Sequence, residues 1–291
     1  MLADCIGSVL RMEIPKHIQA EFLVVDNSED PEMRERNRAA LRGLPGGDIV
    51  TLLHEPRLGA PFGWNRGIET ALERQADVMV ILDDDQTVPP DWLTVVDRVV
   101  REEGADVVKS KVDWLLAGEG KYAEQFEGKD RDLDAQKRLR DIRYVSTNGV
   151  WVSTRLFREF GLRFDEERAL KGATDTKLFT KAYELGARMV ETHEVSAYET
   201  VPVERQTIAW LLKRSFRGGQ SRAQLGLNRK GRVHYFVSGL LETILYGFMT
   251  LLLLWNPVAA LRKARRTAKA VGCLWGAVGG DYEEYRKMVG D

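Results

Sequence analysis

Short apolar strands alternate with helical segments along the first 200 residues. The stretches "AEFLVVDNSED", "GGDIVTLLHEP", "ADVMVILDDD" and "ADVVKSKVDW" are typical of buried strands, and segments such as "GAPFGWNRGIETALERQ" separate them. This alternation predicts βαβ units in an α/β fold, with a mostly parallel sheet flanked by helices. Ligands of such sheets bind beyond the carboxyl ends of the strands.

Carboxylates follow two of these strands at that edge. Asp26 ends the first strand, and Asp83, Asp84 and Asp85 end the third, directly after "VMVIL". Three adjacent carboxylates repel one another, and burying them without compensation is costly. The sequence therefore predicts a positive partner here, which is a basic side chain, a helix N-terminus or a metal ion.

A later segment places another carboxylate at the start of a helix. In "GATDTKLFTKAYELG", Thr174 is a plausible N-cap, and the apolar face comprises Leu178, Phe179, Ala182 and Leu185. Asp175 then lies in the first turn, where the helix dipole favours a negative charge. The charged stretch from 116 to 143 is interpreted as a solvated insertion in preference to an active-site lid.

Charge and cysteine content exclude several classes of protein. The net charge is −1, which argues against a polycation that binds nucleic acid. The two cysteines stand near opposite ends of the chain, so neither a disulfide framework nor a zinc site is expected. A reducing compartment fits this usage, and the first 15 residues do not have the pattern of a signal peptide.

The composition changes after residue 200. Residues 201–232 are predicted to form a basic amphipathic helix, and Phe236 to Trp255 is an apolar run interrupted by Glu242. Twenty apolar residues suffice to cross a bilayer core, and the basic helix that follows suits an anionic lipid surface. We interpret residues 233–291 as a membrane-associated or re-entrant tail, and the alternative is a buried helix of a soluble oligomer.

Five blocks in order resemble family 2 glycosyltransferases, which have the GT-A fold. They are "VVDNSED", "EPRLGAPFGWNRGIETAL", "ILDDDQTVPPDWL", "NGVWVSTRLFREFGLRFDEE" and "GATDTKLFTKAYELG", within about residues 5–199. The tail "RQTIAWLLKRSFRGGQS" resembles that of membrane-associated members, which act on lipids or polysaccharide precursors. Residues 1–200 would then be the nucleotide-sugar glycosyltransferase domain.

The resemblance implies a nucleotide-sugar donor, a UDP-sugar, held with Mg²⁺ or Mn²⁺. Asp85 would be the direct metal ligand, Asp83 would lie near the ribose and the metal, and Asp84 would occupy the variable middle place on the donor side. Hard cations prefer such oxygen ligands together with phosphate oxygens. A cluster of turn and capping acids is the alternative.

Two further blocks imply donor contacts. Asp26 would bind the nucleotide base, and the alternative is an Asx-turn residue in "DNS". Asn65 and Arg66 match the loop between the second strand and its helix, so one of them would lie near the nucleotide. An Asn that only structures the loop is the alternative for Asn65.

The catalytic base implied by the resemblance is Asp175, although Thr174 stands where the family usually has Glu. His193 is the second choice of base. Trp210 and Arg214, one helical turn apart, would lie on the acceptor side, and the alternative for Trp210 is a core or interface residue. Their block "QTIAW" has Ala209 in place of the family's Arg.

Family members begin with a strand that this sequence lacks. That strand is central in the usual order, so its absence would leave two inner strand edges unpaired, which sheets avoid. We expect the natural chain to be longer at its N-terminus, and the alternatives are that another segment fills the gap or that this copy is impaired.

The hypothesis is an inverting, metal-assisted glycosyltransferase of hexosyltransferase type in polysaccharide biosynthesis. It would act on a lipid-linked or saccharide acceptor at the cytoplasmic face of the cell membrane. The alternatives are a nucleotidyltransferase of related fold and a non-catalytic nucleotide-binding scaffold on the membrane.

Overall fold

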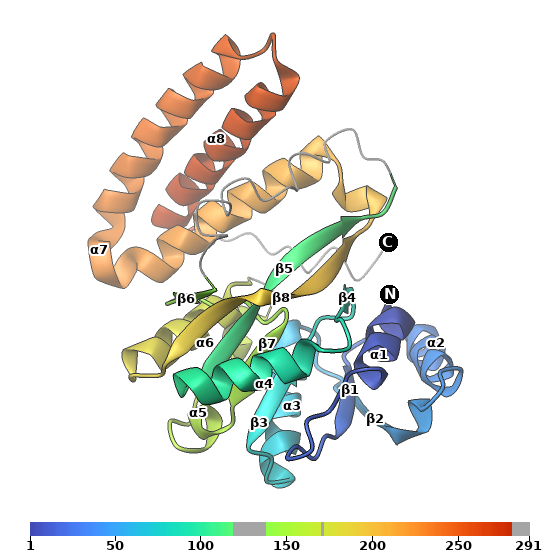
Figure 1. The fold of residues 1–291 in the computed structure, drawn as a ribbon. Coiled ribbons are helices and arrows are strands. Elements are labelled where there is room, and N and C mark those ends of the chain that lie inside the picture. The colour runs from blue at the N-terminus through green and yellow to red at the C-terminus, as the bar shows by residue number, and fades with distance from the viewer. Residues whose placement is uncertain (119–137, 170–171, 281–291) are drawn as a thin grey trace. The chain divides into compact units, whose positions relative to one another are not determined.

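A computed structural model describes residues 1–118, 138–169 and 172–280, and the chain divides into two units (Figure 1). The sheet unit comprises Met1–Leu115, Asp130–Ala169 and Ala173–Thr200. The helical unit comprises Leu116–Lys129, Leu170–Gly172 and Val201–Asp291. Most of the charged insertion expected between residues 116 and 143 lies outside the described residues.

The sheet unit has a mixed α/β architecture with two sheets. The smaller sheet pairs β1 with β2 in parallel, and the larger sheet has the order β3-β7-β5-β8-β4, with β6 on β8. The strands are β1 (Phe22–Asp26), β2 (Val50–His54), β3 (Val78–Ile81), β4 (Gln86–Thr87), β5 (Val107–Leu116), β6 (Leu139–Asp141), β7 (Val150–Ser153) and β8 (Met189–Val201).

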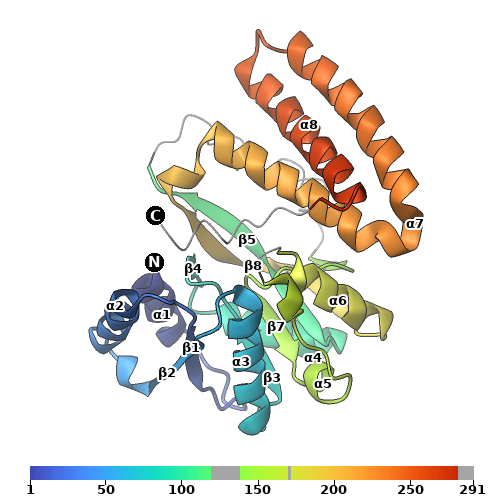
Figure 2. The same cartoon turned by 180° about the vertical axis from the view of Figure 1, so that it is seen from behind.

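Helices cover both faces of the larger sheet (Figures 1 and 2). One core joins side chains of α3, α5 and α6 to the sheet around Ile68, Val107 and Phe179. The other joins α4 to the opposite face around Trp92 and Val108. The helices are α1 (Leu2–Leu10), α2 (Pro31–Arg42), η1 (Gly47–Ile49), α3 (Ala60–Glu73), α4 (Trp92–Glu103), α5 (Arg155–Arg158), η3 (Glu166–Arg168) and α6 (Thr174–Glu184).

Strand directions differ from the mostly parallel sheet that the alternation of elements predicts. β7 pairs antiparallel with both β3 and β5, and β8 pairs antiparallel with both β4 and β6. These directions are set by pairing between segments that are distant in the sequence, and a local alternation of strands and helices does not determine that pairing. The α/β class is confirmed, with a mixed sheet.

The edges of β1 and β3 are half paired. β1 pairs only with β2, and β3 pairs only with β7, among the residues that the structure describes. The expectation of two unpaired inner edges is therefore confirmed for this part of the chain. Helix α3 contacts both β1 and β3, so it spans the two sheets where they do not pair.

The helical unit is built from two long helices, α7 (Ile208–Leu252) and α8 (Pro257–Ala277), which follow η4 (Val203–Arg205). The backbone of α7 is interrupted at Gly231, whose φ of 76° favours glycine because it has no Cβ. The Thr207 side chain caps the start of α7, and the Asn256 side chain accepts from the Ala259 amide at the start of α8.

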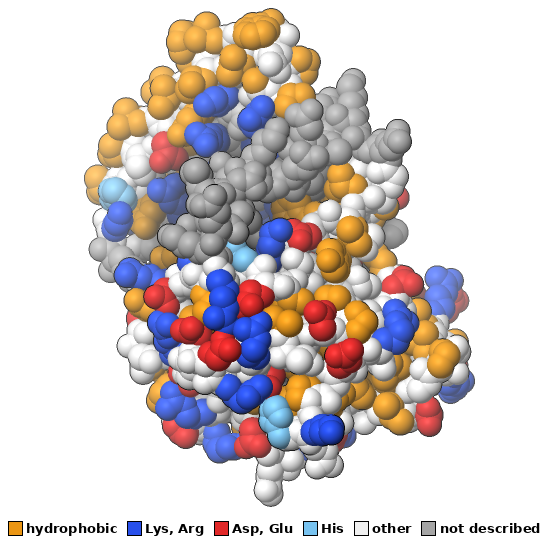
Figure 3. Space-filling model, in the orientation of Figure 1, with side chains coloured by type: hydrophobic (Ala, Val, Ile, Leu, Met, Phe, Trp, Pro, Cys, Tyr) orange, Lys and Arg blue, Asp and Glu red, His pale blue; other side chains and the backbone are white. Residues whose placement is uncertain are grey.

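Apolar side chains cover much of the second half of α7. Residues Lys230–Leu252 form a helix long and apolar enough to cross a membrane, with a mean hydropathy of 1.4 and only 11% of the apolar window buried. Leu241 and Ile244 are 62% and 63% exposed, and Trp255, in the turn before α8, is 80% exposed. Figure 3 shows hydrophobic side chains, in orange, gathered over the region of α7 and α8.

Candidate functional site

An acidic cluster, defined as Asp83, Asp84, Asp85 and Glu199, forms where β3 ends. The Asp83 amide donates to the Gln86 side-chain oxygen at 3.1 Å, and the Gln86 amide donates back to the Asp83 carbonyl at 3.0 Å, which closes a tight turn. The Thr200 amide donates to the Asp85 carbonyl at 2.9 Å. The turn is thereby fixed to β8, and the three carboxylates are held together.

Glu199 is a member of this cluster that the sequence interpretation missed. β4 pairs with β8 in the register that sets Gln86 opposite Glu199. The side-chain amide of Asn148 donates to Glu199 at 3.2 Å. A strand register between distant segments cannot be read from one sequence.

Burial and neighbouring carboxylates both act on Asp83 in this cluster. Burial, together with repulsion from Asp85, Glu199 and Asp84, raises the pKa of Asp83 to about 7. The buried ammonium of Lys109 opposes this shift and also donates to the Asn148 carbonyl. A bound cation would relieve the repulsion that these carboxylates exert on Asp83.

These residues fit a divalent cation that is shared with a ligand. No group of three or more His, Cys, Asp or Glu in the described part of the chain is arranged to hold a metal ion by itself. Mg²⁺ typically uses one or two carboxylates and takes its other ligands from phosphates and water. The carboxylates of Asp83 and Asp85 are oxygen donors of the type that such a cation uses.

Gly149, next to Asn148, allows close packing beside the acidic cluster. Gly149 has a φ of 69°, and a Cβ there would lie 2.8 Å from Ser110 Oγ and 3.0 Å from Ala197 Cβ. The loop before β7 therefore packs directly on β5 and β8, which brings Asn148 to Glu199. A larger residue at position 149 would move Asn148 and Lys109 away from their partners.

Asp26 lies at the end of β1 with its carboxylate in an Asx turn. Ser28 donates to one carboxylate oxygen through its amide at 2.9 Å and its hydroxyl at 2.6 Å, and Asn37 donates to the other at 3.1 Å. Burial raises the pKa of Asp26, but these hydrogen bonds outweigh it, and the pKa is lowered overall. Asp26 also lines a cavity of about 720 Å³ with Arg34 and His54.

Asn65 and Arg66 lie in α3 and differ in their surroundings. The buried amide of Asn65 donates to the Phe164 carbonyl at 2.9 Å and to Glu166 at 3.0 Å, and it accepts from the Phe164 amide at 2.9 Å. Asn65 thus ties α3 to the segment before η3. Arg66 is half-buried and lies 4.0 Å from Glu69, so its guanidinium is the more available of the two.

Asp175 lies in the first turn of α6, as the sequence predicts. The N-cap is Ala173, with a φ of 58°, and not Thr174, which is the first helical residue and is buried. The Thr176 amide donates to the Asp175 carboxylate at 2.6 Å. On the predicted apolar face, Leu185 is 41% exposed because it follows the last helical residue.

His193, the second choice of base, lies on β8 with a carboxylate partner. Its ring nitrogen is 3.5 Å from a Glu191 oxygen, and Arg140 binds the same Glu191 oxygen. The contacts of His193 are therefore with residues that hold β6 and β8 together.

Trp210 and Arg214 belong to the helical unit, in α7. The Arg214 guanidinium lies 5.0 Å from the centre of the Trp210 ring, a cation–π contact that fixes the two side chains together. Trp210 also packs against the small core of Val201, Leu211 and Leu261. The predicted spacing of one helical turn is therefore present.

Comparison with protein families and curated proteins gives two similarities. Residues 1–163 match the model of glycosyl transferase family 2. The succinoglycan biosynthesis protein ExoM of Rhizobium meliloti (strain 1021) is 27% identical over 238 residues, which cover 77% of this chain and 71% of ExoM.

Solved structures with a similar fold include TarS and GalNAc-T7. The crystal structure of TarS 1-349 from S. aureus has a TM-score of 0.53 at 16% identity, covering 97% of this chain and 88% of that one. GalNAc-T7, crystallised with UDP, GalNAc and Mn²⁺, has a TM-score of 0.58 at 13% identity, covering 94% of this chain and 52% of that one. At these identities the likeness shows a shared fold.

Proposed function

The chain belongs to glycosyl transferase family 2 and has the GT-A fold, and on this premise we propose an inverting glycosyltransferase that uses a nucleotide-sugar donor. An acceptor hydroxyl oxygen forms a new bond to the anomeric carbon of the sugar. The bond from that carbon to the diphosphate oxygen breaks, and the nucleoside diphosphate leaves with the electron pair.

The acidic cluster is the observation that carries this proposal. Asp83, Asp84, Asp85 and Glu199 lie together, and burial followed by repulsion among these carboxylates raises the pKa of Asp83. A cation bound between them would offset that repulsion. Asp83 and Asp85 would hold Mg²⁺ or Mn²⁺, with Glu199 beside them. When bound, such an ion stabilises the negative charge of the leaving diphosphate.

Asp175 is proposed as the general base. Its place in the first turn of α6 favours the ionised carboxylate, which can accept the proton of the acceptor hydroxyl. Asp84 and Arg66 are proposed on the donor side, and Asp26 is proposed near the nucleotide base, held in place by Ser28 and Asn37.

The donor and the acceptor are proposed from the named relatives. TarS has been crystallised with UDP-GlcNAc, and GalNAc-T7 with UDP and Mn²⁺, so a UDP-sugar is proposed here. The succinoglycan relative supports a saccharide or lipid-linked saccharide acceptor. Trp210 and Arg214 are proposed to contact that acceptor.

Membrane association completes the proposal. The exposed apolar side chains of α7 and the basic residues of α8 would bind the chain to the cell membrane, and we propose its cytoplasmic face.

The test is the identity of the released product. The full chain is incubated in detergent with UDP-glucose, UDP-galactose or UDP-GlcNAc, with Mn²⁺ or with a chelator. We expect UDP to appear slowly by donor hydrolysis with Mn²⁺ and not with the chelator. Conversion of UTP and a sugar phosphate into pyrophosphate would instead identify a nucleotidyltransferase, and no turnover of any donor would favour a non-catalytic scaffold.

A further inference from the structure

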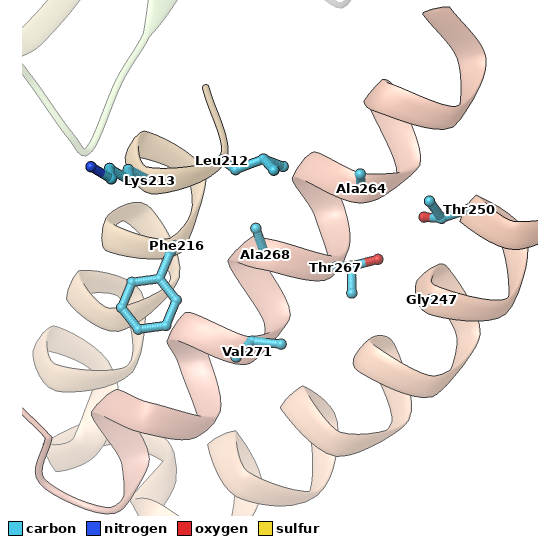
Figure 4. Close-up of a pocket in the computed structure, with 9 residues that line it drawn as sticks. All are labelled: Leu212, Lys213, Phe216, Gly247, Thr250, Ala264, Thr267, Ala268 and Val271. Atoms are coloured by element: carbon cyan, nitrogen blue, oxygen red, sulfur yellow. The ribbon is translucent and has the colours of Figure 1, made fainter. Parts of the chain in front are cut away.

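Three helical stretches lie side by side in the helical unit (Figure 4). α8 lies between the first half of α7, which carries Phe216, and the second half, which carries Gly247 and Thr250. The break at Gly231 separates the two halves. Contacts between the stretches therefore show which of their residues lie at the same level along the helices.

The second half of α7 turns small residues toward α8. A Cβ on Gly239 would lie 3.0 Å from Leu274 Cγ, and one on Gly247 would lie 4.0 Å from a Thr267 methyl group. Small residues between neighbouring helices are typical of helices in lipid. The inner side of this stretch is therefore suited to contact between helices and offers little apolar burial.

The opposite side of this stretch carries an exposed apolar stripe, which we call the outer face. It consists of Val237, Leu241, Ile244, Phe248 and Leu251, which recur every three or four residues and are 48% to 67% exposed. A helix in water buries such a stripe against the rest of the protein. The outer face is therefore placed for contact with lipid and not for the core of its own unit.

A charge pair lies level with the middle of the same stretch. Lys230–Leu252 is about 35 Å long as a helix, with Leu241 at its midpoint. Glu242, the next residue, lies 3.7 Å from Arg222 in the first half of α7. A position of Leu241 at the centre of a bilayer would therefore take both charged side chains there.

α8 adds cations near this level. A Cβ on Gly239 would lie 3.2 Å from the Ala270 carbonyl, so the neighbouring Lys269 lies within about one helical turn of the midpoint. Arg266 lies 5.4 Å from the centre of the Tyr246 ring, and Tyr246 is about 7.5 Å along the helix from the midpoint. Both cations are therefore level with the inner part of the apolar stretch.

Tight packing prevents α8 from shifting away from these levels. A Cβ on Gly219 would overlap the Lys269 carbonyl, and one on Gly272 would overlap the Phe216 carbonyl. Helix backbones at this separation leave no room for a lipid chain between them. The charges of α8 and of the first half of α7 therefore move with the apolar stretch when it meets a membrane.

These levels distinguish three orientations of the helical unit on a membrane. A spanning α7 would carry Arg222, Glu242 and Lys269 to the bilayer centre, where charged side chains are costly. A hairpin that enters one leaflet with the turn at Trp255 first would leave Val237, at the other end of the outer face, outside the hydrocarbon. An orientation in the plane of the interface immerses the whole outer face and keeps α8 on the side away from the lipid.

We propose that the outer face of α7 binds one leaflet of a lipid bilayer, with the second half of α7 lying in the plane of the interface without crossing the hydrocarbon core. The start of α7 and the end of α8 then stay on the same side of the membrane. This inference rests on the proposed membrane association, and it is independent of the proposed transfer chemistry.

The test measures the depth of single labels on the full chain bound to liposomes. Val237→Cys, Leu241→Cys and Phe248→Cys each carry one fluorophore, which lipids brominated at successive positions of the acyl chain quench according to its depth. Both native cysteines are buried, so the introduced cysteine reacts first, and the unaltered chain gives the background. Met33→Cys, at an exposed position of the sheet unit, is the matched control, and circular dichroism checks that each variant is folded.

We expect all three outer-face labels at one shallow depth, about 5–10 Å into the boundary between headgroups and acyl chains, and no quenching of Met33→Cys. A Leu241 label deeper than the other two would show a spanning helix, and a Phe248 label about 16 Å deeper than the Val237 label would show a hairpin that enters turn first. Either gradient would overturn the proposal and leave membrane association intact. Quenching of Met33→Cys equal to that of the outer-face labels would show that the outer face is not the binding surface, and a soluble dimer that does not bind liposomes would overturn membrane association as well.

Discussion

At the scale of single residues, Asp175 is the side chain on which the proposed chemistry most depends. Asp175→Asn keeps the shape and removes the proton acceptor, so transfer should fall by about 10²–10⁴-fold while donor binding persists. Turnover and UDP binding are measured on the same preparations. His193→Gln is the comparison, and it should change turnover much less because Glu191 gives His193 a structural environment. The reverse order of effects would mean that the base is misassigned.

Asp26 gives a prediction about stability and pH. Folding lowers the pKa of Asp26, so the ionised carboxylate stabilises the folded chain. This contribution to the free energy of unfolding is complete above the unfolded pKa near 4, and it is lost as the pH falls through the folded pKa. Asp26→Asn should cost about 1–3 kcal/mol at pH 7, because an amide donor then faces Asn37. Urea unfolding at pH 7 and at pH 2.5 should show that the loss of unfolding free energy caused by Asp26→Asn is smaller at the lower pH. An equal difference at both values would contradict this account.

At the scale of elements, the half-paired strands β1 and β3 predict an alternating pattern of amide protection. Successive amides of a strand point to opposite edges, and each of these strands is bonded along one edge in the described structure. Native-state hydrogen exchange should therefore find alternate amides of Phe22–Asp26 and Val78–Ile81 fast. Uniform slow exchange along both strands would show that another segment or chain covers these edges.

Local patterns predicted some elements of the site and missed others. The apolar run into Asp83–Asp85 and the helix that starts beside Asp175 are features of neighbouring residues, so the sequence was enough. Glu199 joins the cluster through the β4–β8 register, and Asn65 finds its partners near Phe164, which are long-range contacts. The antiparallel direction of β7 and β8 is also set by pairing between distant segments.

At the scale of the whole molecule, the exposed apolar surface of α7 predicts membrane binding. Leu241→Asp with Ile244→Asp should release the chain from liposomes in a flotation assay, because a charge in the hydrocarbon of a bilayer costs up to about 2.5–3.5 kcal/mol per residue. Met33→Asp with Ile49→Asp is the matched control, since both residues are exposed in the sheet unit. If the unaltered chain does not float, or if both double variants behave alike, the membrane account is wrong.

The central claim is that the acidic cluster binds a nucleotide sugar together with a divalent cation, and calorimetry of UDP binding tests it most directly. The unaltered chain should bind UDP at least tenfold more tightly with Mn²⁺ than with a chelator, because the cation links the carboxylates to the diphosphate. Asp85→Asn should lose most of that gain, and Asp91→Asn, the same change at an exposed position nearby, should keep it. UDP affinity that is independent of Mn²⁺, or unchanged in Asp85→Asn, would contradict the account.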